Sequence, residues 1–349
     1  MRRAVLLALL PAALAVTTVA VLGAIIIGAL GKDALEVGGQ ALHATLLTGY
    51  GLSQVFFKST PLILCGLAVA VPLTAGLFNV GGEGQLAAGG LAAALVAGWL
   101  AGAGAVATTA AVMAAALAGG AAGAGCGVLR HTRGVHEVIS TIMANFILAA
   151  GCGWLLHAFA AEPGTSHTPE LPADVLFTRL GSVLDAVQGS LLSTSLPLAL
   201  VLAALLQWVL WRTVWGFELR ASGLAPRAAV HAGIRAAAMV VGSMALGGAL
   251  AGLAGAHFVL GARRFFEEGM SGGEGFLGIA VALMARSQPA AVVPAALLFA
   301  ALSQAGLSMA SHVPRELVLV LQGAVVLVLG GTGPLVDALS RRRAEVRDG

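Results

Sequence analysis

The chain has 349 residues, of which 58% are hydrophobic and only 10% are charged, and its mean hydropathy is +0.94. Because soluble domains carry about 25% charged residues, this composition excludes an ordinary soluble protein. The net charge of +3 comes mainly from arginines in short connections, a pattern that does not favour nucleic-acid binding. Uncharged stretches of about 20 residues match the thickness of the hydrocarbon core, and in lipid a helix forms all of its backbone hydrogen bonds internally. These stretches therefore predict an all-α polytopic membrane protein.

The N-terminus carries Arg2 and Arg3 before a long apolar run. This arrangement is also typical of a secretory signal, whose apolar region has about 7–15 residues. The run here extends over about 4–30, so we expect an uncleaved first transmembrane helix, with a cleaved signal as the alternative. We therefore expect residues 1–349 to form a single transmembrane domain.

Apolar runs bounded by charges or turn residues predict about ten transmembrane helices. The expected spans are about 4–30, 61–79, 84–103, 105–129, 137–160, 194–215, 236–260, 276–286, 290–311 and 315–333. The eighth is too short to cross a bilayer alone and leads into a polar turn at 286–289. A half-helix or a strongly irregular span is expected at this place.

Basic residues are distributed unevenly over this arrangement. With Met1 in the cytoplasm, thirteen of the nineteen basic residues lie on the cytoplasmic side, and the other six are Lys32, Lys58, Arg179, Arg263, Arg264 and Arg315. The positive-inside rule therefore predicts that both termini are cytoplasmic. In the outer segment 161–193 we expect a surface helix over 174–187. The inner segment 216–235 is also predicted to be helical.

Small residues recur at a spacing of four, as at Gly119, Gly123 and Gly127, and at Gly248 and Gly252. In lipid, this spacing lets helix backbones approach closely. The cysteines Cys65, Cys126 and Cys152 all lie in apolar runs, where cysteine usually serves as a small packing residue. They indicate neither a disulfide framework nor a metal site.

The tetrapeptide Gly-Gly-Glu-Gly occurs twice, at 81–84 and at 272–275. The first copy precedes a span that runs outward, and the second precedes a span that runs inward. This placement predicts an inverted repeat of five plus five helices. A chance match in a glycine-rich chain is the alternative.

Polar side chains within apolar spans are candidates for a transport pathway, because burying them in lipid is costly. The candidates are Asn79, Glu83, Gln85, Glu137, Asn145 and Glu274. For Glu83 and Glu137, capping of a helix end is an equal alternative. We expect His257, Gln304 and Gln322 to form hydrogen bonds between helices.

Signatures of enzymes are missing from the chain. It has no GxxxxGK[ST] loop, no HExxH motif and no paired CxxC motif, so we expect no catalytic residue, metal site or cofactor of its own.

The inner segment 216–235 combines charges, two glycine breaks and a proline that suits the start of a helix. It is either a solvated connector or a docking site for a cytoplasmic partner. Its candidate coupling residues are Glu218, Arg220, Ala221, Gly223, Pro226 and Gly233.

Five strings taken together resemble a known family. They are FNVGGEGQL at 78–86, GVHEVISTIMANFIL at 134–148, LRASGLAPRAAVHAGI at 219–234, GGALAGLAGA at 247–256 and GFLGIAVALMARSQPAAVVPAALLF at 275–299. Over roughly 61–335 the chain is similar to permease subunits of bacterial ABC importers for simple sugars and nucleosides, within the branched-chain amino acid and ribose permease superfamily. The nucleoside branch is the most similar.

The resemblance implies a coupling helix within 218–234 that inserts into an ABC ATPase subunit. It further implies a second, related permease chain and an extracytoplasmic substrate-binding lipoprotein. Two positions depart from the family pattern: His136 stands where Asn is usual, and Phe146 stands where Tyr is common.

These observations predict a permease of an ATP-driven importer that moves nucleosides, or a simple sugar, across the bacterial plasma (inner) membrane. ATP hydrolysis is expected on a separate chain, and no nucleic acid is expected as a partner. An ion-coupled secondary transporter of a small hydrophilic solute is the alternative from another class.

Overall fold

The computed structural model describes residues 17–18, 20–182, 189–310, 313–314, 317, 319–324 and 327–328. Within these residues the regular structure is helical, without strands and with two isolated β-bridges. The chain divides into two compact units. One is Ser53–Ala300, here called the central unit, and the other combines Met1–Leu52 with Ala301–Gly349, here called the terminal unit.

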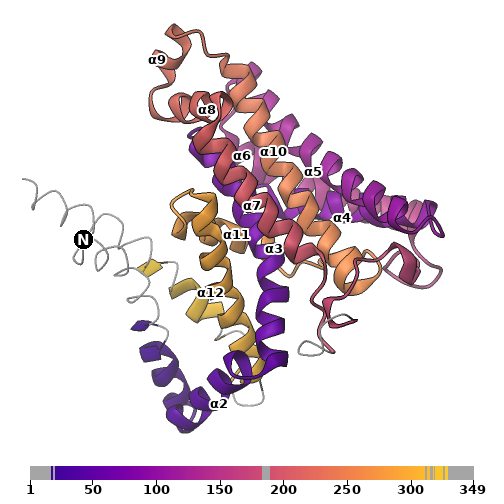
Figure 1. Cartoon of the computed structure of the whole chain (residues 1–349), viewed down its shortest axis with the longest axis vertical. Coiled ribbons are helices and arrows are strands. Elements are labelled where there is room, and N and C mark those ends of the chain that lie inside the picture. The colour runs from indigo at the N-terminus through magenta and orange to yellow at the C-terminus, as the bar shows by residue number, and fades with distance from the viewer. Residues whose placement is uncertain are drawn as a thin grey trace, which may run out of the picture. The chain divides into compact units, whose positions relative to one another are not determined.

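Figure 1 shows the helices along the chain. Their bounds are α2 Ala34–Leu46, α3 Gly49–Thr74, α4 Gly82–Trp99, α5 Ala105–Arg133, α6 Glu137–Leu155, α7 Ser195–Arg212, α8 Val214–Leu224, α9 Pro226–His231, α10 Ala236–Ala256, α11 Glu274–Met284 and α12 Pro289–Ser308. Two π-helical turns, η1 Leu156–Ala160 and η5 His257–Arg263, extend α6 and α10.

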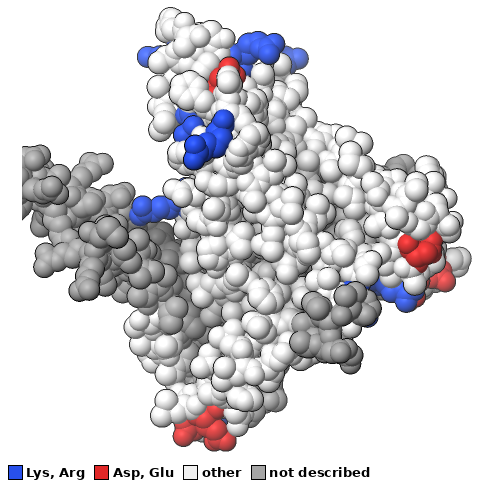
Figure 2. All heavy atoms as spheres, viewed as in Figure 1, with Lys and Arg blue, Asp and Glu red and all other residues white. Residues whose placement is uncertain are grey.

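Six helices in the described part of the chain are long and apolar enough to cross a membrane. They are Gly49–Thr74, Ala105–Arg133, Glu137–Ala160, Ser195–Arg212, Ala236–Arg263 and Pro289–Ser308. Figure 2 shows a mostly uncharged surface, with Lys and Arg gathered over the end of the central unit where α8 and α9 lie. The chain is therefore a multi-pass membrane protein.

Several predicted spans match helices closely. The residues expected to form a span over 84–103 coincide with α4, which is not among these six helices, and those of the short span expected over 276–286 coincide with α11. At 1.5 Å per residue, α11 is only about 16 Å long, roughly half of the hydrocarbon core. The segment 216–235 forms the two helices α8 and α9, and α9 begins with Pro226.

The boundaries predicted for the span 61–79 were wrong. The helix α3 begins at Gly49 and ends at Thr74, and it contains both Lys58 and Pro61, which the sequence suggested as its outer limit. The lysine is tolerated because it lies within electrostatic range of Glu274 on α11. The helix ends early, and residues 77–80 after it have no regular secondary structure.

The surface helix expected over 174–187 was also wrong. Its described residues form only two short 3₁₀ turns, Ala173–Val175 and Leu180–Ser182, and residues 183–188 lie outside the described part. The side chain of Asp174 accepts hydrogen bonds from the backbone of Gly102 and Gly104 at 3.0 and 3.3 Å. These bonds tie the segment to the turn between α4 and α5, so it follows that turn instead of forming a helix.

The terminal unit has its own small core, in which Ile27 and Val37 pack with Val313. Gln322 donates a hydrogen bond to the Ser303 hydroxyl at 2.7 Å, which confirms the expected role of Gln322 between helices. Gln304 is buried in the same unit. Parts of the spans expected over 4–30 and 315–333 lie outside the described residues.

In the central unit, α5 and α10 form the most extensive helix pair. Their backbones touch through glycine: a Cβ on Gly248 would collide with the carbonyl oxygen of Gly119, and one on Gly123 with that of Met244. The repeated glycine spacing in the sequence therefore marks a true helix interface.

We expect Gly248→Ala to destabilise the protein by about 1–3 kcal/mol, because the added methyl group must push two backbones apart. Gly242→Ala on the same helix is the matched control, since a Cβ there meets no atom within 4 Å. Thermal unfolding of the detergent-solubilised variants measures the difference. Equal midpoints for the two variants would contradict the close packing.

Candidate functional site

The helices α3 and α4 are joined by a break in which residues 77–80 have no regular secondary structure. Backbone groups in such a break have no helical partners, and lipid offers none. Asn79 is fully buried, and its side-chain amide serves as a hydrogen-bond partner for backbone groups on both sides of the break. Its Nδ2 donates to the carbonyl oxygen of Ala68 at 3.2 Å, and its Oδ1 accepts from the N–H of Gly81 at 3.1 Å.

Gln85 completes this arrangement from the first turn of α4. The amides of Asn79 and Gln85 are doubly hydrogen bonded to each other, at 3.0 and 3.1 Å. Because both amides are buried, each would leave unpaired polar groups if the other were lost. The two residues thus hold the break in one geometry.

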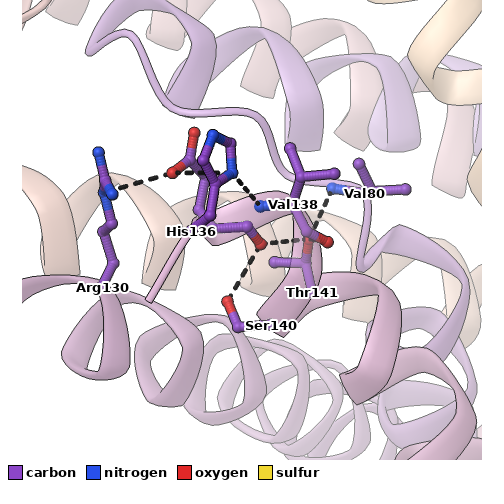
Figure 3. Close-up of polar contacts among 7 residues, drawn as sticks. Val80, Arg130, His136, Val138, Ser140 and Thr141 are labelled. Atoms are coloured by element: carbon purple, nitrogen blue, oxygen red, sulfur yellow. Dashed lines mark hydrogen bonds and ion pairs between the residues drawn. The ribbon is translucent and has the colours of Figure 1, made fainter. Parts of the chain in front are cut away.

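Helix α6 satisfies further backbone groups at the break. Thr141 accepts from the N–H of Val80 at 3.2 Å (Figure 3), and Asn145 donates to the carbonyl oxygen of Val80 at 2.9 Å. Asn145 Oδ1 also accepts from the N–H of Gly84 at 2.8 Å. Thr141 and Asn145 are four residues apart and so lie on the same face of α6.

The two Gly-Gly-Glu-Gly motifs lie directly against each other. The carboxylate of Glu83 accepts hydrogen bonds from the Ser271 hydroxyl and from the N–H of Gly275, the latter at 2.9 Å. A Cβ on Gly275 would lie only 2.6 Å from the backbone nitrogen of Glu83. Glycine is therefore required where the backbones meet, and the Glu83 carboxylate occupies the positive N-terminal end of α11.

A cavity of about 340 Å³ opens beside this contact. It is lined by α4, α6 and the segment that precedes α11, and its polar lining includes Glu83, Asn145, Glu268 and Ser271. The volume falls in the range of pockets for small molecules, about 300–1,000 Å³. Of the sequence candidates, the structure brings Asn79, Glu83, Gln85 and Asn145 together around this cavity and the adjoining break.

Glu274 lies beside the same contact as the first residue of α11. It is within electrostatic range of Glu83 and of Lys58 on α3. Its Oε2 is buried and has no hydrogen-bond partner among the described residues. Three ionisable side chains from three helices therefore lie in the region of the junction of the two motifs, with Glu274 within electrostatic range of the other two.

Glu137 lies elsewhere, at the N-terminus of α6, and does not line the cavity. Its buried carboxylate forms an ion pair with Arg130 at 3.3 Å. His136 is the N-cap of α6, and its Nδ1 accepts from the N–H of Val138 at 3.4 Å (Figure 3). The histidine thus performs the capping for which Asn is a preferred residue.

The candidate coupling residues lie in and around α8 and α9 (Figure 1). The Arg220 guanidinium stacks 4.3 Å from the centre of the Trp211 ring, which joins α8 to α7. Pro226 is the first residue of α9, and Gly233 follows its end with a φ of 84°. Gly223 packs against the end of α3, since a Cβ there would collide with the carbonyl oxygen of Thr74.

The remaining members of this group are Glu218 and Ala221, both within α8 and both partly exposed. The hydroxyl of Ser222 donates to the carbonyl oxygen of Glu218 at 2.8 Å.

His257, at the junction of α10 and η5, is buried, and its Nδ1 is hydrogen bonded to the Ser195 hydroxyl of α7 at 2.8 Å. This bond confirms the expectation that it links helices. Three site residues were missed from the sequence, Thr141, Glu268 and Ser271. Their signals were weak: Thr141 lies one turn before Asn145, and Ser271 directly precedes the second motif.

The chain is similar to known transport proteins over most of its length. It is 30% identical over 316 residues to the nucleoside ABC transporter permease protein NupB of Lactococcus lactis subsp. cremoris, a match covering 88% of this chain and 86% of the relative. It is 34% identical over 319 residues to the glucose ABC transporter permease protein TsgB13 of Haloferax volcanii, covering 88% and 83%. It is 33% identical over 290 residues to the guanosine ABC transporter permease protein NupP of Bacillus subtilis, covering 81% and 82%.

No solved structure matches the chain. A family model described as the branched-chain amino acid transport system / permease component matches residues 51–330. That region contains the broken segment, both Gly-Gly-Glu-Gly motifs and the helices α8 and α9. The match confirms the resemblance read from the sequence motifs, and the chain belongs to the branched-chain amino acid transport system / permease component family.

Proposed function

We propose that this chain is the permease subunit of an ATP-driven importer that carries nucleosides into a bacterial cell across the plasma membrane. The observation that carries the proposal is the polar cavity beside two broken helices, in a chain similar to two nucleoside-type permeases. Irregular backbone at membrane depth is typical of a transport pathway. The relatives are ABC transporter permeases, so they give no support to the ion-coupled alternative.

The lining of the cavity suits a nucleoside chemically. The carboxylates of Glu83 and Glu268 can accept hydrogen bonds from ribose hydroxyls, and the amide of Asn145 retains capacity for a base edge. Ala87, Ala149 and Ala150 add apolar lining for a ring face. A hexose would satisfy the carboxylates but offers only its C–H groups to this lining and no planar base, so a simple sugar is the second candidate, supported by the glucose permease relative.

The proposal includes a single permease domain of ten spans arranged as an inverted repeat of five plus five. The contact between the two Gly-Gly-Glu-Gly motifs supports this arrangement, because equivalent segments of an inverted repeat meet near its axis. Both termini then lie in the cytoplasm. Import proceeds by alternating access, with one half moving against the other.

The partners in the proposal are an ABC ATPase subunit that hydrolyses ATP, a second and related permease chain, and an extracytoplasmic binding lipoprotein. The loop 216–235 receives the ATPase. Leu224 is 88% exposed at the end of α8, and Val230 is 56% exposed on α9. Exposed apolar side chains on a charged end of the molecule suit a protein partner better than solvent.

The function is tested by reconstituting the permease with its ATPase, partner permease and lipoprotein in lipid vesicles. We expect uptake of radiolabelled nucleosides that requires ATP, is blocked by vanadate and is insensitive to a proton ionophore. Excess glucose should not compete. Uptake of glucose in place of nucleosides would support the sugar candidate, and loss of uptake with the ionophore would contradict an ATP-driven importer.

The docking role of the loop is tested with Leu224→Asp, which should lower uptake about tenfold or more, since it would bury an unpaired carboxylate in the interface, and burying an unpaired charge is costly. Leu35→Asp is the matched control, because Leu35 is equally exposed, at 88%, on the side expected to face outward. Gly223 is unsuitable for this test, since a bulky residue there would strike the end of α3. Coupled transport by Leu224→Asp at the level of Leu35→Asp would show that the loop is a connector only.

The orientation is tested with reporter fusions. A reporter attached after Gly349 should behave as cytoplasmic and one inserted near Thr168 as external, because basic residues concentrate on the proposed inner side. A phosphatase that needs disulfides and is therefore active only outside the cytoplasm, paired with a fluorescent protein that is active only inside it, distinguishes the two. An external C-terminus would contradict the ten-span arrangement.

A further inference from the structure

The two Gly-Gly-Glu-Gly motifs have the same sequence but different hydrogen bonds. Glu83 of the first motif accepts from the N–H of Gly275 in the second, at 2.9 Å. The corresponding bond from the second motif to the first would run from the N–H of Gly84 to the carboxylate of Glu274. Gly84 instead donates to Asn145 Oδ1 at 2.8 Å.

The carboxylate left over in this arrangement is that of Glu274. Its Oε2 is buried and without a hydrogen-bond partner among the described residues, although it lies within electrostatic range of Glu83 and Lys58. A buried acceptor without a donor destabilises the conformation that contains it. The N–H of Gly84, one helix away, is a donor that would satisfy it.

We propose that Glu83 and Glu274 are alternating interhelical caps. In the conformation described here Glu83 caps α11 at Gly275, and in the conformation open to the other side of the membrane Glu274 caps α4 at Gly84. This inference rests on the proposed function and on its inverted repeat, since two halves of such a repeat exchange roles between the two conformations.

The two caps exclude each other because a single donor, the N–H of Gly84, is shared by two acceptors. The N–H of Gly84 carries one hydrogen, so Asn145 and Glu274 compete for it. The close contact of the motifs ties the two ends together: the α-carbon and backbone nitrogen of Glu83 lie against Gly275, so a displacement that frees Gly275 also moves Gly84. The contacts are therefore suited to two discrete arrangements.

Release of Glu83 has a consequence for the cavity. Glu83 lines the cavity while both its oxygens are occupied, by Ser271 and by Gly275. Once released, the carboxylate offers its full acceptor capacity in the wall of the pathway, instead of only the part that these two bonds leave. A hydroxyl or N–H donor on the substrate would bind it there and favour the exchanged conformation, because a ligand shifts an equilibrium toward the state that it binds better.

The native Cys152 provides a reporter of the exchange. It lines the cavity and is buried, with 6% of its surface exposed. Cys65 and Cys126 are also buried, and replacing both with alanine leaves Cys152 as the single thiol. The rate of its alkylation by N-ethylmaleimide, in the full chain assembled with its partners in vesicles, measures how often the contact between the motifs opens.

We expect Glu83→Gln to raise this rate about fivefold or more and Glu274→Gln to lower it by a similar factor, because each substitution weakens the charge-assisted cap of a different conformation. The double variant should return toward the rate of the unsubstituted protein. Ser271→Ala, which removes only one bond of Glu83, should raise the rate by a smaller factor and replaces Glu83→Gln in the test if that variant does not fold.

Opposite shifts support the alternating caps. Shifts in the same direction, or no shift in either variant, overturn them, because a purely structural role of either residue would loosen the site in both cases. The readout requires no transport. Absence of nucleoside uptake by the unsubstituted complex would count against the proposed function and leave the alkylation result to stand by itself.

Discussion

The structure of the central unit depends on one constraint: residues 77–81 lie between two apolar helices without regular secondary structure, and lipid offers their backbone no hydrogen bonds. Asn79 and Gln85 satisfy it from within the segment, and Thr141 and Asn145 satisfy it from α6. The cavity lies where this network ends. A polar site in this membrane protein is thus a by-product of the groups that make the broken backbone tolerable.

Close packing of glycine allows this network to form. Where α5 meets α10 and where the two Gly-Gly-Glu-Gly motifs meet, the backbones approach so closely that no side chain would fit between them. The same residue type serves two purposes. Between long helices, glycine allows the close van der Waals packing on which helix association in lipid depends, because lipid provides no hydrophobic driving force. Between the motifs it brings a carboxylate within reach of a helix N-terminus.

The sequence revealed the helices and much of the site because both depend on composition. Polar side chains in apolar runs are costly to bury in lipid and therefore indicate a structural or functional role. This cost identified Asn79, Glu83, Gln85 and Asn145 from the sequence. Thr141 and Ser271 were not identified, because small hydroxyl residues are common in helices and turns and their partners lie far away in the chain. The start of α3 was misplaced for a related reason: the acidic neighbour that makes Lys58 tolerable comes from α11.

The contact between Gly223 and the end of α3 connects the loop 216–235 to the broken segment. Gly223 lies against Thr74, and the chain then runs through only a few residues without regular secondary structure to Asn79 and the first motif. Side-chain hydrogen bonds hold this segment at Asn79, Val80 and Gly81, so a displacement of its start at Thr74 is carried toward the first motif and the cavity beside it. The charged end of the protein and the cavity are thus linked through a short irregular segment with fixed hydrogen bonds. If a partner ATPase drives the permease, as proposed, 74–85 is the element through which movement of α8 would reach the site.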